Sequence, residues 1–158
     1  MVRWLFLLVF SAALLAAAGC DRPAEKVAQP AAPMERKETQ VVVPPEVDGK
    51  WQAVQIAVLD KEQGKEELFT VGLGQEFQLP EAGLSIKVQN FLPAFIMDGT
   101  LLTSVSNEPR NPAVQIIIRQ GEEEVYKGWL FSLFPGTHAF QHPRFSFSLV
   151  DYIPAKKG

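Results

Sequence analysis

Residues 114–133, which decide the fold class of this chain, read VQIIIRQGEEEVYKGWLFSL. The run from Val114 to Arg119 is rich in β-branched residues, which favour extended backbone because their side chains fit a pleated surface. Gln120-Gly121 then supplies a turn, and the stretch from Val125 to Leu133 returns with its aromatic residues on one face. The pattern predicts an antiparallel β-hairpin.

Alternation of apolar and polar residues continues on both sides of this hairpin. Val54 to Val58 and Leu68 to Leu73 flank a Gly-containing turn, and Phe145 to Ile153 alternates Phe and Leu with Ser. No window of about 11 residues after Trp51 shows a helical stripe. We therefore predict an all-β domain of about seven mostly antiparallel strands, closed as a sandwich or small barrel with a Phe-rich core. The predicted strands are 54–58, 68–73, 77–79, 84–88, 114–119, 125–133 and 145–153.

Length, charge and cysteine content exclude several classes of protein. A chain of 158 residues allows one domain of ordinary size. The net charge is −3 and no stripe of Lys and Arg is present, so a nucleic-acid partner has no electrostatic basis. Two His and one Cys exclude a Cys-rich zinc module, a disulfide framework and a thiol redox pair.

The amino terminus resembles the export signal of a bacterial lipoprotein. Arg3 gives a positive start, Leu5 to Ala18 form an apolar run interrupted only by Ser11, and small residues precede Cys20. The run is shorter than the roughly 20 residues that cross a bilayer, which argues against a permanent transmembrane helix. In the lipobox that this pattern resembles, a signal peptidase cuts before the Cys and the thiol receives diacylglycerol. We therefore predict a signal peptide over residues 1–19 and lipidation of Cys20, the alternative being an uncleaved signal anchor.

The predicted location is the bacterial cell envelope, with the chain anchored in a membrane through Cys20 and the domain facing the periplasm. Asp21 resembles the retention signal of inner-membrane lipoproteins in enteric bacteria, which favours the inner membrane and leaves the outer membrane open. Two or three acyl chains, at about 0.8 kcal/mol per buried methylene, hold a protein at a bilayer. The membrane is thus the first predicted partner.

The segment after the lipidated Cys, residues 20–49, contains five prolines and no aromatic residue. Such a composition cannot bury a core and predicts a flexible tether. Val41 to Val43 is the one apolar island, compatible with a short edge strand before Pro44-Pro45. The predicted β-domain covers residues 50–154, and residues 155–158 form a tail.

The longest connection between predicted strands, residues 91–112, is too apolar for a disordered loop. Connections longer than about 12 to 15 residues tend to be functional or structured in their own right. This one is either a flap that covers one end of the sandwich or a binding surface for an apolar ligand or an envelope protein. Together with the turn at 134–140, it supplies the candidate contact residues Phe95, Ile96, Met97, Leu101, Leu102, Phe134, His138 and Phe140.

The only two histidines, His138 and His142, lie close together in the sequence, which raises the hypothesis of a metal or catalytic site. Two imidazoles with no carboxylate or thiol between them do not make a zinc or copper site. The chain also lacks the G-x-S-x-G, Gly-rich phosphate-loop and H-E-x-x-H motifs. We therefore predict a binding or assembly module that is not an enzyme and has no metal or cofactor, with the histidines as local hydrogen-bond partners. The alternative is an envelope enzyme or metal-handling accessory that uses His138 and His142.

Several short stretches between about residues 54 and 153 carry a resemblance to a known family. They include Val58-Leu59-Asp60-Lys61, Asn111-Pro112-Ala113 and, as the most specific part, Gly128-Trp129-Leu130-Phe131 to His142-Pro143. In these stretches the folded part resembles the bacterial DUF2155 domain. This family has no assigned biochemical activity. The resemblance therefore implies a domain type and an envelope location, and leaves the function open.

The resemblance also implies one contact inside the domain. Members of the family often carry one Cys after the strand matched by Ile86 to Asn90 and another after the position of Asp151. This chain has Phe91 and Tyr152 at those places. The resemblance therefore implies an aromatic contact between these strands in place of a disulfide.

Changing Cys20→Ser should abolish metabolic labelling with a fatty acid and release the protein from membranes, because the thiol is the predicted attachment site. Cell fractionation followed by immunoblotting measures the release. A variant that stays on the membrane with an uncleaved amino terminus would show that Cys20 is not the anchor.

Overall fold

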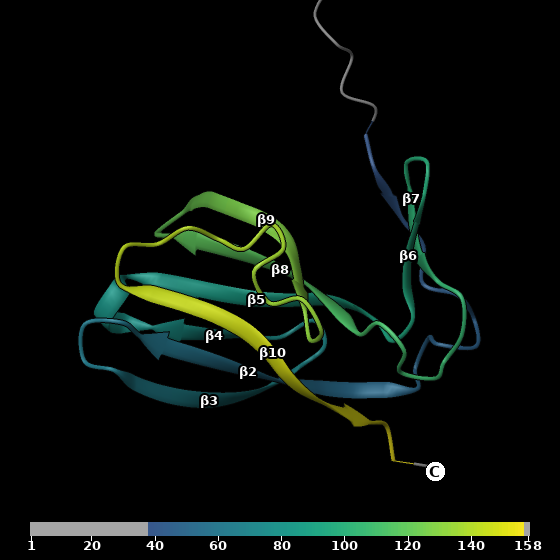
Figure 1. The fold of residues 1–158 in the computed structure, drawn as a ribbon, viewed down its shortest axis with the longest axis horizontal. Helices are drawn as coiled ribbons and strands as arrows, with labels where there is room; N and C mark the ends of the chain where they lie inside the picture. The colour runs from purple at the N-terminus through teal and green to yellow at the C-terminus, as the bar shows by residue number, and fades with distance from the viewer. Residues whose placement is uncertain (1–37, 157–158) are drawn as a thin grey trace, which may run out of the picture. The chain divides into compact units, whose positions relative to one another are not determined.

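The computed structural model describes residues 38–156, so the predicted signal peptide, Cys20, Asp21 and most of the predicted tether lie outside the described residues. In chain order the elements are β1 (Gln40–Val41), β2 (Trp51–Asp60), β3 (Lys65–Gly72), β4 (Glu76–Leu79), the 3₁₀-helix η1 (Pro80–Ala82), β5 (Leu84–Leu92), β6 (Phe95–Asp98), β7 (Leu101–Ser104), β8 (Ala113–Gln120), β9 (Glu123–Phe131) and β10 (Phe145–Pro154) (Figure 1). Within this part of the chain, no helix is long and apolar enough to cross a membrane.

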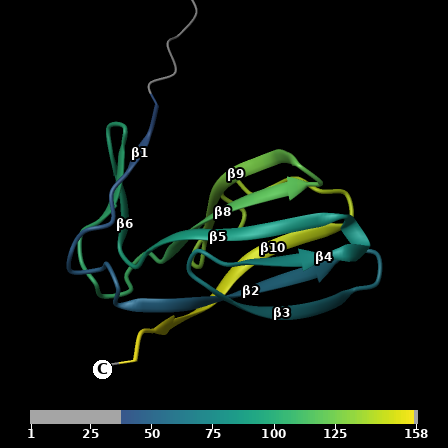
Figure 2. The same ribbon diagram turned by 180° about the vertical axis from the view of Figure 1, so that it is seen from behind.

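Two antiparallel sheets form a sandwich, one with strand order β10-β2-β3 and one with strand order β4-β5-β8-β9 (Figures 1 and 2). Side chains from both sheets, among them Val54, Ile86, Ile116 and Phe147, form one buried apolar core. The predicted all-β sandwich is confirmed. All seven predicted strands are present, as β2, β3, β4, β5, β8, β9 and β10.

A third sheet, with strand order β1-β7-β6, was not predicted, and it raises the number of strands in the described residues to ten. The chain leaves the sandwich after β5, forms the β6–β7 hairpin and returns as β8, so the hairpin stands at one end of the sandwich (Figure 1). β1 pairs with β7 in parallel. These strands have only two to four residues, too few for alternation to be recognised in the sequence.

The predicted boundary between tether and domain at residue 50 is wrong. The Gln40 N–H donates to the Thr100 carbonyl at 2.8 Å, and the Val42 N–H donates to the Leu102 carbonyl at 2.9 Å. Val47, in the turn that follows β1, is only 2% exposed. Residues 40–49 belong to the domain, because their backbone groups find partners there and Val41, Val43 and Val47 pack on it.

Two β-bulges determine which side chains enter the core at this end of the sandwich. In β5, Gln89 and Asn90 together face one residue of β8, so the next residue, Phe91, turns inward and is 2% exposed. In β10, Val150 is the extra residue, and Tyr152 packs against the core. Without these insertions, strict alternation would turn Asn90 inward instead of Phe91.

The two bulges bring three aromatic rings together. Phe91 stacks on Tyr152 with ring centroids 5.3 Å apart, which confirms the aromatic contact implied by the family resemblance. Trp51 meets both rings edge-on, at 5.0 Å from Phe91 and 5.4 Å from Tyr152. Edge-to-face and offset-stacked arrangements suit the ring quadrupoles. This end of the sandwich is therefore closed by a packed aromatic cluster.

Val47→Ala should lower the free energy of unfolding by about 1 to 2 kcal/mol, because it removes two buried methyl groups and leaves a small cavity. Val42→Ala is the matched control: Val42 is 47% exposed, so the change should stay within about 0.5 kcal/mol of the parent protein. Urea denaturation of both variants measures the difference. Equal, negligible effects would mean that the tether does extend to residue 49.

Candidate functional site

The β6–β7 hairpin is attached to the sandwich by a hydrogen-bonded junction. The Phe95 N–H donates to the Asn111 carbonyl, and the Asn111 side-chain amide donates back to the Phe95 carbonyl, both at 3.1 Å. The buried Ser104 hydroxyl accepts from the Ala94 N–H and donates to the Ser106 carbonyl, both at 2.8 Å. The segment that enters the hairpin and the segment that leaves it are both hydrogen-bonded at the junction. These hydrogen bonds hold the hairpin against the sandwich.

One face of the hairpin packs on the outer side of the four-stranded sheet. Met97 lies directly opposite Leu102, and Phe95 follows on the same face two residues away. The Phe95 ring lies 5.1 Å from the Trp129 ring and 5.0 Å from the Phe131 ring. Leu102, Trp129 and Phe131 belong to a second apolar cluster, separate from the main core, and Phe95 packs against it. The cluster forms the base of the candidate site.

An apolar groove with a volume of about 350 Å³ lies between the hairpin, β9 and the turn after β9. The hairpin contributes Phe95, Met97 and Leu102, β9 contributes residues 126–129 and 131, and the turn contributes Thr137 and His138. The volume falls in the range of small-molecule sites, about 300 to 1,000 Å³. Met97 is 62% exposed at the edge. We call this space the narrow part of the groove.

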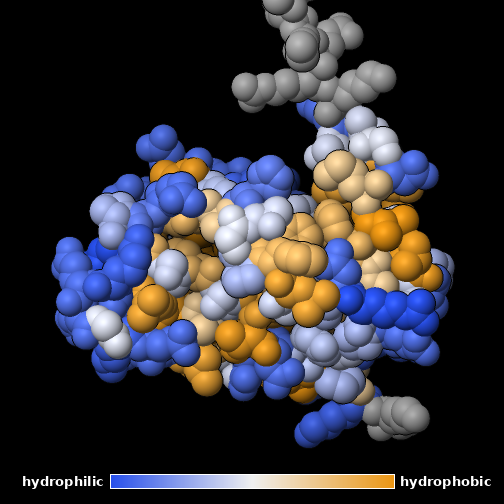
Figure 3. Space-filling model, viewed as in Figure 1, coloured by the Kyte–Doolittle hydropathy of each residue, from blue (hydrophilic) through white to orange (hydrophobic). Residues whose placement is uncertain are grey.

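A wider hollow of about 900 Å³ continues from the narrow part over the outer face of the four-stranded sheet. Its lining includes Gln89, Asn90 and Gln115, and the Asn90 amide donates to the Gln115 side-chain oxygen at 2.7 Å. Glu38 and Thr39 line its other side. Figure 3 shows apolar side chains gathered over the β6–β7 hairpin and along the connection from β9 to β10. This wide part of the groove is more polar than the narrow part.

Tyr126 and Gly128 hold the turn that borders the groove. A Cβ at position 128 would collide with the Tyr126 ring, so glycine lets that ring lie along β9. The Tyr126 hydroxyl donates to the His138 carbonyl at 2.7 Å, and its ring packs 5.3 Å from the Phe140 ring. Partial burial raises the pKa of Tyr126, so the hydroxyl keeps its proton and this hydrogen bond at neutral pH.

The structure brings half of the predicted contact residues together. Phe95, Met97, Leu102 and His138 line the groove. Ile96 and Leu101 lie on the opposite face of the hairpin, because alternate residues of a strand point to opposite sides. Phe134 is 59% exposed but does not line the groove, and Phe140 packs against the main core. The predicted connection 91–112 is therefore a hairpin with one packed face and one open face.

Several groove residues were missed by the sequence analysis. Trp129 and Phe131 were not among the predicted contact residues; they are buried under the hairpin, in the second cluster and not in the main core. The hairpin itself had one usable signal, the dipeptide Asp98-Gly99 between apolar residues. Gly99 has a φ of 60°, as such a tight turn requires.

The histidines do not share a site of their own. The His142 Nδ1 accepts the backbone N–H groups of Arg144 at 3.2 Å and Phe145 at 3.0 Å, which confirms its predicted role as a local hydrogen-bond partner. The exposed His138 borders the groove. Among residues 38–156, no group of three or more His, Cys, Asp and Glu side chains is placed to hold a metal ion.

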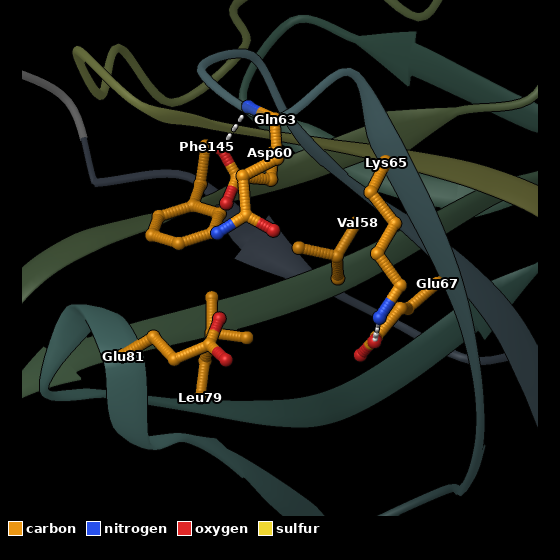
Figure 4. Close-up of a pocket in the computed structure, with 8 residues that line it drawn as sticks. All are labelled: Val58, Asp60, Gln63, Lys65, Glu67, Leu79, Glu81 and Phe145. Carbon is orange, nitrogen blue, oxygen red and sulfur yellow. Dashed lines mark hydrogen bonds and ion pairs between the residues drawn. The ribbon is translucent and has the colours of Figure 1, made fainter.

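A second cavity lies beside the turn between β2 and β3 (Figure 4). Its volume of about 30 Å³ has room for little more than one water molecule. Figure 4 shows Lys65 directed at Glu67, and Asp60 directed at the backbone of Gln63. The Asp60 carboxylate accepts the backbone N–H of Gln63 at 3.2 Å. The cavity is too small for an organic ligand, so its polar residues hold the turn.

Asp60 also ties this turn to the start of β10. Its carboxylate accepts from the Arg144 guanidinium at 3.0 Å and 2.6 Å, and from the backbone N–H groups of Glu62 and Gln63. These hydrogen bonds, with that of Arg144 the largest influence, lower the pKa of Asp60 from 3.8 to about 2. The interaction is structural and lies apart from the groove.

Comparisons of the chain with protein-family models, with curated proteins and with solved structures found no match. The resemblance to the DUF2155 domain therefore stays a prediction from the residues quoted above. A function has to be argued from the groove and from the amino-terminal sequence.

Stability should decrease as the pH falls from about 4 to about 2, and Asp60 should contribute to that decrease. Its pKa is lower in the folded chain than in the unfolded chain, so the unfolded state binds more protons in this window and acid favours unfolding. Asp60→Asn should therefore show a smaller change of denaturation midpoint between these pH values. Glu67→Gln, which breaks an exposed ion pair with Lys65, is the control and should behave like the parent. An unchanged pH profile in Asp60→Asn would contradict the assignment.

Proposed function

We propose that this protein is an envelope lipoprotein, anchored through Cys20, whose β-domain is a binding module that takes an apolar ligand or partner in the groove. The groove carries this proposal. Its narrow part is lined mainly by apolar side chains, and Met97 leaves 62% of its surface in solvent there. Apolar surface left exposed in this way usually marks a contact site.

The way the groove is built supports binding. Phe95, Trp129 and Phe131 pack on one another at the base, and all three come from strands. A site on rigid elements loses little conformational entropy when it is filled, so more of the contact energy appears as affinity. Met97 has an unbranched, flexible side chain that adapts to the shape of an occupant.

The location is proposed on the amino-terminal sequence. The charged start, the short apolar run and the small residues before Cys20 are typical of a lipoprotein signal. The domain then faces the periplasm at the end of a tether, and Asp21 favours the inner membrane. We propose binding and not catalysis for this domain.

A photoreactive amino acid placed at Met97 should form a discrete adduct in living cells, because this position lies at the groove and is exposed. Leu68 on β3 is the matched control, since it is 61% exposed and lies outside the groove. Gel electrophoresis and mass spectrometry of the purified protein identify the adduct.

Met97→Gln should reduce binding of the identified occupant while changing the free energy of unfolding by less than about 0.5 kcal/mol, as is usual at surfaces. Equal adducts at positions 97 and 68 would contradict a specific site. A loss of several kcal/mol of stability in Met97→Gln would instead make the hairpin a structural flap.

A further inference from the structure

The narrow part of the groove combines an apolar base with a single permanent charge. Among its lining residues, Lys127 is the one with a full charge at neutral pH. On the outer face of the sheet, Lys127 pairs with Ile117, which in turn pairs with Lys87. Ile117 is only 5% exposed, as expected if the aliphatic stems of its two neighbours lie along it. Lys127 therefore brings an ammonium group to the edge of the groove, and Lys87 lies two strands away on the same face of the sheet.

The charge of Lys127 is not paired in the described structure. Within residues 38–156, neither Lys127 nor Lys87 makes an ion pair with a carboxylate. Lys87 does have a carboxylate residue, Glu76, directly opposite it in the sheet, and Glu38 lines the wide part of the groove. An anionic group at Lys127 would thus meet a cation that has no competing partner.

The narrow part suits a hydrocarbon chain better than a peptide. A buried peptide brings one N–H and one C=O per residue, and each needs a hydrogen-bond partner. Tyr126 already donates its hydroxyl proton to the His138 carbonyl, and Thr137 is the other hydroxyl in the lining. An acyl chain needs no such partners and gains from contact with the aromatic base.

The described part of the chain begins beside the groove. Glu38 and Thr39, its first two residues, line the wide part of the groove. Cys20, the proposed lipidation site, lies 18 residues before Glu38 in the sequence. Lipidation at Cys20 would bring this domain to a membrane that supplies phospholipids.

We propose that the groove holds one acyl chain of an anionic membrane phospholipid, with the phosphate of its headgroup at Lys127. This inference rests on the proposed function, because anchoring at Cys20 supplies the lipid surface. The end of the acyl chain packs against Phe95 and Trp129, and Met97 closes over it from the hairpin. The positive charge of the groove then faces the phosphate of the phospholipid, and its apolar base contacts the acyl chain.

The test uses the full lipidated protein in phosphatidylcholine vesicles that contain phosphatidylglycerol with a photoreactive diazirine on one acyl chain. After irradiation, mass spectrometry should place lipid adducts on groove residues such as Met97 and Trp129. Met97→Asp should lower the adduct yield roughly tenfold, because a carboxylate against an acyl chain loses its hydration without gaining a partner. Ile96→Asp, the neighbour on the opposite face of β6, should keep the yield of the parent.

The headgroup is tested with Lys127→Glu. The adduct yield with the anionic probe should fall in Lys127→Glu. A separate variant, Lys127→Arg, should keep the yield of the parent protein, because the proposed contact needs a positive charge. Circular dichroism confirms that all variants keep their strand content. Equal yields in Lys127→Glu and the parent would overturn the headgroup assignment and with it the proposal.

Two further outcomes would overturn the proposal and still identify what lies on this domain. Adducts on Ile96 and Leu101 in place of Met97 would mean that the hairpin rests on the bilayer by its open face. No lipid adduct in the groove, together with a protein adduct at position 97 in cells, would mean that the occupant is a polypeptide. In that last case the proposed binding function stands and only the lipid assignment fails.

Discussion

The stacking of Phe91 on Tyr152, with Trp51 edge-on to both, is the contact on which this structure depends. It requires a bulge in β5 and a bulge in β10, because plain alternation would turn Phe91 outward. The Trp51 indole N–H donates to the Asn107 side chain at 2.7 Å, which ties the cluster to the segment that returns from the hairpin. The bulge in β5 also sets Leu92 beneath the hairpin. One aromatic contact thus determines both the end of the core and the place of the groove.

The third sheet exists because the four-stranded sheet is apolar on both faces near the hairpin. Residues 113–118 of β8 are all buried, which is typical of a strand covered on both sides. The main core covers one side, and the hairpin covers the other side only at the Ala113 end. Farther along, Ile117 has Lys87 and Lys127 as its cross-strand neighbours, and it belongs to neither of the two apolar clusters found in the described residues. The groove lies at the edge of the hairpin. Its base is apolar because the hairpin covers only part of the apolar outer face of the four-stranded sheet.

The sandwich could be predicted from the sequence, whereas the bulges and the third sheet could not. Seven strands were predictable, because each has alternation or a β-branched run with a turn signal beside it. The bulges were not, since Gln89-Asn90 has no sequence feature that marks an insertion. Half of the predicted contact residues line the groove. The apolar character of residues 95–102 indicated the hairpin side, and His138, from the turn after β9, also lines the groove. The β9 side of the groove was missed because a Trp at position 129 fits a core equally well, and only the third sheet distinguishes the two.

The short strand β1 lies at the amino-terminal end of the described residues and is bonded to a strand that lines the groove. Its residue Val41 packs in the second cluster, and the Thr103 hydroxyl donates to the Val42 carbonyl at 2.8 Å. β7, the strand to which β1 is bonded, carries Leu102 into the groove. A two-residue strand has few hydrogen bonds, so it opens at a lower free-energy cost than the sandwich strands. A local opening of β1 would therefore disturb the wall of the groove before it disturbs the main core.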